Sequence, residues 1–323
     1  MEKKPNQVKI RLKRIRYLIF SVLFVLLLMP SAPVAQQPGS GLITYQESIT
    51  TDEEDRKLVL PSFIYADLLT SEVYVVDGKG RIIIFSSELF PLITLGKKDG
   101  VEAPQGLTVD ANGNLYIAQS VSKSNPRNRI SVYNACLKWE RDIYLEDFEG
   151  SGSFAPYRLA MDKKGNLYVT ASHFAGLLYI DTMGRIIDII APEERGEKVK
   201  LHNVVIDKAG RIYVVSEDES RIYVYDENRK FMYKFGEKGG STGKLSRPKA
   251  IGVDDRTGRN YVVDYMRHTV TAYDKEGNYL FEFGGLGWSE GWFQHPIDLA
   301  LDSKGRIFVA DLFNQRIQVF NSW

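Results

Sequence analysis

The sequence predicts an all-β fold: a six-bladed β-propeller of four-stranded antiparallel blades, closed by an N-terminal strand added to the last blade. A segment that joins two apolar-alternating strands through a turn, D-x-x-G in five of its six copies, carries this prediction. The period of the segment suits a four-stranded blade. The aromatic residue of its second strand recurs after 42, 52, 45, 48 and 47 residues, at Tyr74, Tyr116, Tyr168, Tyr213, Tyr261 and Phe308.

Each copy continues with two further strands, such as RIYVY from Arg221 and FMYKF from Phe231, separated by the turn DENRK. The sixth copy ends after its third strand, at Trp323. Residues 42–49 precede the first copy and have no other partner. We therefore expect them to pair with the strand RIQVF, which begins at Arg316, because this closes the ring and removes an exposed edge.

Composition supports one large β domain, with 44% hydrophobic and 12% aromatic residues in 323. The net charge of +1 includes a strongly basic N-terminus, so the rest of the chain is mildly acidic. An acidic body argues against a nucleic-acid partner, which needs a basic face. The single cysteine, Cys136, excludes an internal disulfide and a four-thiolate zinc site. It lies in the strand-like run SVYNACLKW, where we expect a buried side chain.

Residues 1–35 are typical of a signal peptide or an N-terminal membrane anchor. Seven basic side chains precede the apolar run 17–29, whose thirteen residues suit a signal-peptide core. The uncharged stretch 17–35 keeps a retained anchor open, and it is the only expected contact with a membrane. Either reading places the body outside the cytoplasm, in the periplasm or the extracellular space. Residues 36–41 are interpreted as a linker, and residues 42–323 as the propeller.

Two glycine-rich loops share the pattern G-x-x-G-x-x-x-G-x-[LF]-x-x-P: GEKGGSTGKLSRP from Gly236 and GGLGWSEGWFQHP from Gly284. Together with ADLFNQRIQVF from Ala310, they make the six copies resemble NHL repeats across residues 42–323. The resemblance implies the six-bladed fold. It implies no particular activity, because propellers include enzymes, binding modules and scaffolds.

In such a blade the first strand lines the central channel. The loops between blades and those between strands two and three then open on one face, called here the long-loop face. Long loops on a rigid scaffold usually carry binding, and we expect a polar pocket at this mouth of the channel. The predicted ligand-binding residues are Gln105, Tyr157, His202, Lys249, Asp264, Tyr265 and Asp311.

Within this set, Tyr157, His202 and Lys249 occupy one repeat position on successive blades, so they should converge on an anionic or carbonyl-bearing ligand. A structural role stays open for the aspartates. The NHL resemblance implies that the aspartate ending strand two pairs with the arginine opening strand three. Here these pairs would be Asp77 with Arg81 and Asp311 with Arg316.

Two enzyme classes are relevant. The chain is similar to the peptidyl-hydroxyglycine amidating lyase, and the resemblance puts His202 at a zinc-ligand position. The equivalent positions of other blades hold Gln105, Tyr157 and Lys249, so no metal site is predicted. Calcium-dependent lactonase-like propellers use acidic and amide groups that Gln119, Asp264 and Asp311 could mimic, which leaves calcium in the channel open. No cofactor is otherwise expected.

These observations favour an exported binding or scaffold module for a protein, peptide or glycan. A metal-assisted lyase or hydrolase at the channel mouth is the alternative, so whether the chain is an enzyme stays open at this point.

Overall fold

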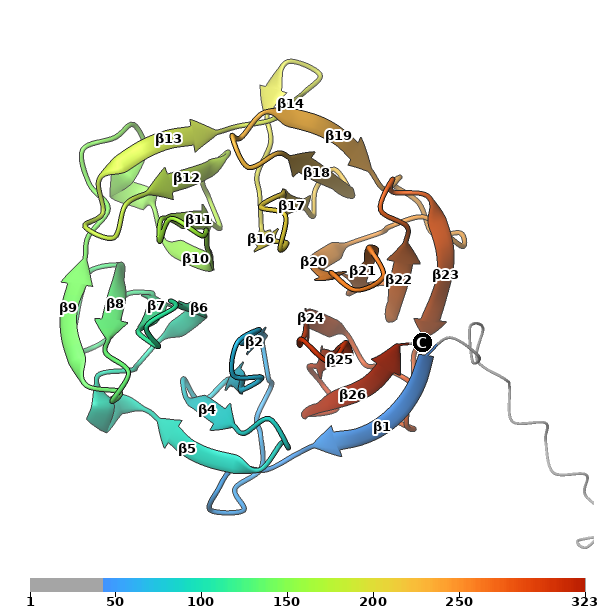
Figure 1. Cartoon of the computed structure of the whole chain (residues 1–323), viewed down its shortest axis with the longest axis horizontal. Helices are drawn as coiled ribbons and strands as arrows, with labels where there is room; N and C mark the ends of the chain where they lie inside the picture. The colour runs from blue at the N-terminus through green and yellow to red at the C-terminus, as the bar shows by residue number, and fades with distance from the viewer. Residues whose placement is uncertain (1–42, 323) are drawn as a thin grey trace, which may run out of the picture. The chain divides into compact units, whose positions relative to one another are not determined.

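The computed structural model describes residues 43–322. They form six four-stranded antiparallel sheets, arranged as blades around a central channel (Figure 1). The predicted fold is confirmed. The expected signal peptide or anchor (residues 1–35) and the linker (36–41) lie outside the described residues.

In every blade the strands run in order from the channel to the rim. Their bounds are β2 (Phe63–Ala66), β3 (Val73–Val76), β4 (Ile82–Phe85) and β5 (Pro91–Leu95) in blade one; β6 (Pro104–Val109), β7 (Leu115–Gln119), β8 (Arg129–Tyr133) and β9 (Trp139–Ile143) in blade two; β10 (Pro156–Met161), β11 (Leu167–Ala171), β12 (Leu177–Ile180) and β13 (Ile186–Ile190) in blade three; β16 (Asn203–Ile206), β17 (Ile212–Ser216), β18 (Arg221–Tyr225) and β19 (Phe231–Phe235) in blade four; β20 (Pro248–Asp254), β21 (Arg259–Asp264), β22 (Thr269–Tyr273) and β23 (Tyr279–Gly284) in blade five; and β24 (Pro296–Leu301), β25 (Arg306–Asp311), β26 (Arg316–Ser322) and β1 (Ile43–Ile49) in blade six.

The ring closes as expected, through the N-terminal strand. β1 pairs antiparallel with β26, from Ile43 opposite Ser322 to Ile49 opposite Ile317. Ile43 packs into the apolar cluster between blades five and six, and Ile49 into the cluster between blades six and one. The strand thus supplies the rim of blade six and contacts both of its neighbours.

Apolar clusters fill the spaces between neighbouring blades, because each sheet buries both of its faces. The recurring second-strand aromatic is buried in all six blades. Between blades five and six the rings of Phe283, Phe293 and Phe320 meet edge to face, with centroids 5.2–6.2 Å apart. This packing holds the inner strands of the six blades in place around the channel.

The D-x-x-G turns have a specific structural basis. In blade six, Oδ1 of Asp302 accepts hydrogen bonds from the main-chain N–H groups of Lys304 and Arg306, at 3.0 and 2.8 Å. Gly305 completes this turn with φ of 80°, a conformation that glycine adopts without steric cost. In blade one the turn is one residue longer, and Ser71 closes it with φ of 60° and donates its main-chain N–H to the carbonyl of Asp67 at 2.8 Å.

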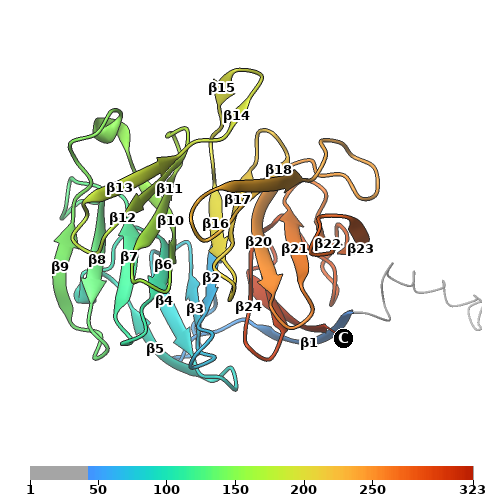
Figure 2. The same cartoon turned by 45° about the horizontal axis from the view of Figure 1, so that its top comes forward.

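The hairpin of β14 (Glu193–Glu194) and β15 (Glu197–Lys198) belongs to the loop between blades three and four and projects from the disc (Figure 2). Two short 3₁₀ segments, η1 (Lys97–Asp99) and η2 (Ser151–Ser153), also lie in loops between blades. Among the described residues, no helix has the length and apolar character needed to span a membrane.

The prediction for Cys136 was wrong. Its side chain is exposed, in the turn between β8 and β9. Asn134 heads this turn, because its Oδ1 accepts the main-chain N–H of Cys136 at 3.0 Å. A side-chain bond of this kind breaks a strand, so the run SVYNACLKW is two strands joined by a turn.

Candidate functional site

Five side chains form a connected group at the long-loop end of the channel, called here the mouth cluster: His202, Glu217, Arg247, Lys249 and Tyr265. Nζ of Lys249 donates a hydrogen bond to Oε2 of Glu217 at 2.5 Å, and Nε of Arg247 lies 2.8 Å from Oε1. Nε2 of His202 lies 3.8 Å from Oε2 of the same carboxylate. Nζ of Lys249 also lies over the ring of Tyr265, 5.4 Å from its centroid.

The charges of the mouth cluster follow from these contacts. Burial alone would raise the pKa of Glu217, but the hydrogen bond and charge of Lys249, with His202 and Arg247, hold it below its ordinary value. Burial lowers the pKa of His202, and Lys249 adds to this effect against the opposing pull of Glu217. Nδ1 of His202 accepts the main-chain N–H of Glu217 at 3.4 Å, which suits a neutral imidazole. Two cations therefore face one carboxylate, and the cluster can attract a ligand with acidic or carbonyl groups.

A row of aromatic rings extends from the mouth cluster across blades five and six. The ring of Tyr265 lies 4.6 Å from that of His295, which lies 5.1 Å from that of Phe313. The ring of His268 meets His295 edge to face at 4.3 Å, and its Nδ1 accepts the main-chain N–H of His295 at 2.9 Å. The row thus links the channel mouth to the loops between β23 and β24 and between β25 and β26.

Exposed apolar side chains lie on the same loops and are called here the apolar patch: Met266, Leu286, Trp288 and Phe313. Trp288 is 76% exposed and Phe313 46% exposed. The loops that carry them are tied together, because Nδ2 of Asn314 donates to the carbonyl of Gly287 at 2.9 Å. Large apolar side chains held open to solvent in this way are typical of interaction sites.

Asp264 and Asp311 have the structural role that the sequence leaves open for the aspartates. Both are fully buried. Asp264 accepts main-chain N–H groups of the loops around it, including that of Ser246 at 2.6 Å. Asp311 accepts the N–H of Gln294 at 2.6 Å and pairs with Arg316 at 2.9 Å. Both carboxylates therefore anchor loops of the long-loop face.

The other expected aspartate pair, Asp77 with Arg81, also forms, at 2.6 Å. Gln119 is likewise buried and bonds to Glu102 and Ser131 close to it in the chain. Gln119, Asp264 and Asp311 thus belong to three different blades, and each side chain bonds to residues of its own blade or of the loop beside it.

The two remaining predicted residues, Gln105 and Tyr157, contact residues close to them in the chain. Nε2 of Gln105 donates to the carbonyl of Ala103 at 3.3 Å, and the Arg158 guanidinium lies 4.1 Å from the ring centroid of Tyr157. His202 and Lys249 meet through Glu217. The convergence of Tyr157 with these two residues stays a prediction.

Sequence reasoning missed a second ring of side chains, one position further along each inner strand. Its members are Phe63, Gly106, Arg158, Asn203, Ala250 and Asp298. The guanidinium of Arg158 donates to the main-chain carbonyls of Ser62, at 2.9 Å, and of Gln105. Asp298 accepts the N–H of Ile64 at 2.9 Å, and Asn203 accepts that of Ile251 at 3.4 Å. Every one of these bonds joins one blade to another.

Gly106 makes room for Arg158 in this ring. A side-chain carbon at Gly106 would lie 2.5 Å from the carbonyl oxygen of Tyr157 and 3.3 Å from Cδ of Arg158. The signal in the sequence was a single arginine and a single aspartate at a repeat position that is otherwise uncharged. Within residues 43–322, no three histidine, cysteine, aspartate or glutamate side chains lie close enough together to hold one metal ion.

Comparison with known proteins agrees with this architecture. Residues 293–320, which include β24 and β25, match the family described as NHL repeat. The chain is a six-bladed β-propeller with an NHL repeat. No curated protein matches the sequence of this NHL propeller significantly.

Several solved structures resemble the NHL propeller. An auxiliary nutrient binding protein from Bacteroides thetaiotaomicron is 12% identical with a TM-score of 0.66, over 87% of this chain and 76% of that one. Its counterpart from Bacteroides ovatus is 15% identical with a TM-score of 0.64, over 87% and 77%. A streptogramin B lyase is 15% identical with a TM-score of 0.55, over 91% and 96%. At these identities the likeness shows the fold alone.

Proposed function

We propose that this NHL propeller is exported and acts as a binding or scaffold module for a protein, peptide or glycan, which it engages through the long-loop face. The observation that carries the proposal is the row of rings from Tyr265 to Phe313, which joins the mouth cluster to the apolar patch. Aromatic, methionine and arginine side chains are enriched where proteins bind partners, and this face presents all three.

The arrangement favours an extended ligand with two kinds of chemistry. Lys249 and Arg247 would receive an acidic or carbonyl group at the mouth, and the rings would stack against an apolar or sugar face further out. The loops are pre-organised for this, because buried Asp264 and Asp311 hold them. A ligand therefore pays little entropy to order the site.

Export rests on two supports. The basic residues of positions 1–16 precede an uncharged stretch, the charge order of exported chains. Two structurally similar proteins are called auxiliary nutrient binding proteins, names that suit a binding role outside the cytoplasm. N-terminal sequencing of the chain from its native cells tests export. Cleavage near Ala35 or membrane retention is expected, and a cytoplasmic chain with intact Met1 would contradict it.

Affinity capture tests the binding role. The full chain and a Trp288→Ala/Phe313→Ala variant are immobilised and exposed to the envelope fraction of the native cells. We expect the wild-type chain to retain a ligand that the double variant loses. Trp139→Ala is the matched control, because Trp139 is 57% exposed on β9, the rim strand of blade two, across the ring from the apolar patch of blades five and six (Figure 1). Equal retention by all three chains would contradict the assignment of binding to this face.

A further inference from the structure

The channel contains a cavity of about 190 Å³ that none of the seven predicted mouth residues lines. For comparison, an apolar cavity of roughly 150 Å³ in another protein binds benzene. The walls come from the inner strands of all six blades and are mostly apolar, with Ile64, Leu159, Ile251 and Leu299 among them. The cavity is therefore large enough for a compact small molecule.

One end of the cavity is closed by the second ring, with Arg158, Asn203 and Asp298 in its lining. Arg158 is 4% exposed and Asp298 is 1% exposed. Their hydrogen bonds go to main-chain groups of other blades. Within residues 43–322, neither charge has an opposite charge within ion-pair distance, although each lies in the field of the other. Isolated buried charges of this kind are costly.

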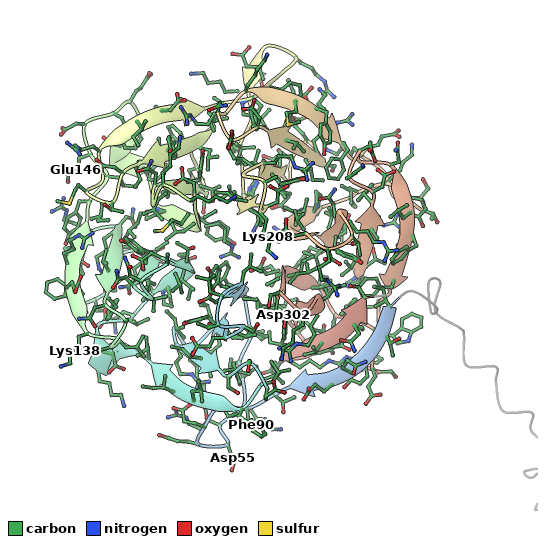
Figure 3. All side chains as sticks on the ribbon, viewed as in Figure 1. Asp55, Phe90, Lys138, Glu146, Lys208 and Asp302 are labelled. Carbon is green, nitrogen blue, oxygen red and sulfur yellow. The ribbon has the colours of Figure 1, made fainter. Side chains whose placement is uncertain are left out.

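The other end of the cavity reaches the face opposite the mouth cluster. Leu68 and Asp255 line this end, and both lie in turns between strands one and two. In Figure 3 two residues of such turns, Lys208 and Asp302, lie close to the centre of the ring, whereas Phe90 and Lys138 lie at the rim. A ligand would thus enter between the short turns, away from the long loops.

We propose that the channel binds a small zwitterion with a compact apolar body, of the class of free aliphatic α-amino acids. Its carboxylate faces Arg158, its ammonium group faces Asp298, and its side chain lies among the apolar walls. Charge balance is the reason. One positive and one negative group stand at the closed end, so a ligand of either net charge would leave one charge uncompensated, whereas a zwitterion complements both. This site is independent of the function proposed for the long-loop face.

Three probes with one apolar body test the proposal in the full chain at pH 8: L-leucine, isocaproate, which lacks the ammonium group, and isoamylamine, which lacks the carboxylate. Isothermal titration calorimetry should show one leucine site per chain. Each single-charge probe should bind at least about tenfold more weakly, because a charged hydrogen bond is lost. No saturable binding of leucine, or equal binding of the three probes, would overturn the proposal.

Variants locate the site. Asp298→Asn keeps an oxygen acceptor for the N–H of Ile64 and should weaken leucine binding about tenfold. Ala300→Leu fills the cavity and should abolish binding; Val205→Phe serves the same purpose if that variant does not fold. Lys249→Ala, in the mouth cluster, should leave leucine binding unchanged. Unchanged binding in a folded cavity-filling variant would place leucine elsewhere and overturn the assignment.

Discussion

Two neighbouring rings of the channel differ, although adjacent residues of the same strands build them. His202 and Lys249 at the mouth are partly open to solvent and interact with a side chain, the carboxylate of Glu217. One position further along, Arg158 and Asp298 are buried and bond to the main chains of other blades. The comparison teaches that a shift of one residue along an inner strand separates partly exposed groups of the long-loop face from buried groups that hold the ring together and line the cavity.

The energetic expectation follows from this difference. Partly exposed ion pairs contribute little to stability, whereas removal of a buried, hydrogen-bonded charge is strongly destabilising. Substitutions in the mouth cluster should therefore act mainly on binding at the long-loop face, whereas those at the closed end should change stability in addition to binding in the cavity.

The largest effect is expected from removal of the closing strand, on which both the mouth cluster and the second ring depend. Deletion of residues 36–50 removes β1, with its ladder to β26 and the buried Ile43 and Ile49. We expect aggregation, or a loss on the order of 5 kcal/mol in the free energy of unfolding. Deletion of 195–198, exposed residues of the hairpin of β14 and β15, is the control; it leaves Glu194 as the acceptor for Tyr223 and should cost under about 1 kcal/mol. A β1-deleted chain that melts like the full one would show that closure is not needed.

Removal of the guanidinium at the closed end should have the next largest effect. Arg158→Met loses the bonds to Ser62 and Gln105, which join three blades. We expect the free energy of unfolding to fall by on the order of 3 kcal/mol, because two partly buried carbonyl acceptors lose a charged donor. Lys249→Met at the mouth should cost about 1 kcal/mol or less. Urea unfolding of both variants measures the difference, and equal losses would contradict the contrast between the two rings.

A pH dependence should sharpen the same contrast. Burial raises the pKa of Asp298 to about 6, from 3.8 for an unperturbed aspartate. The folded state therefore holds this proton more tightly than the unfolded state. The protonated Asp298 thus adds to the free energy of unfolding in full below about pH 4, and this contribution is lost as pH rises through about 6. Asp298→Asn should gain stability relative to wild type between these values, by on the order of 2 kcal/mol. A difference in melting temperature that does not change with pH would contradict this.

The smallest effect concerns the mouth cluster. The charge of Glu217 raises the pKa of His202 against the effect of burial. Glu217→Gln should therefore lower the pKa of His202 further. NMR titration of the imidazole measures this shift, with Glu227→Gln, on an exposed turn, as the control. A rise in the His202 pKa would show that the carboxylate does not act on it.

The fold could be predicted because a repeat is a pattern along the chain. Register, blade number and the closing strand all follow from the recurrence of strands and turns and from the missing outer strand of blade six. Cys136 was misplaced because an asparagine-headed turn looks like a strand when only apolar spacing is read. The equivalent turn DENRK in blade four was recognised, so alignment of NACLK with it would have shown the turn.

The site was predicted only in part. His202, Lys249 and Tyr265 stand at repeat positions that face the mouth, so the register found them. Arg158 was missed because its acceptors are main-chain carbonyls, which carry no sequence signal. The row from Tyr265 through His295 to Phe313 joins three loops of two blades. Such a contact depends on loop conformation, which the spacing of the repeats does not encode.

Position-specific photo-crosslinking in the native cells tests the central claim, that the long-loop face binds the partner, most directly. Trp288 in the apolar patch and Trp139 on the rim strand β9 are both exposed, and each is replaced in turn by p-benzoylphenylalanine in the full chain. On irradiation, we predict a discrete adduct of higher mass from position 288 and none from position 139. An adduct from position 139 alone, or equal adducts from both, would contradict binding through the long-loop face.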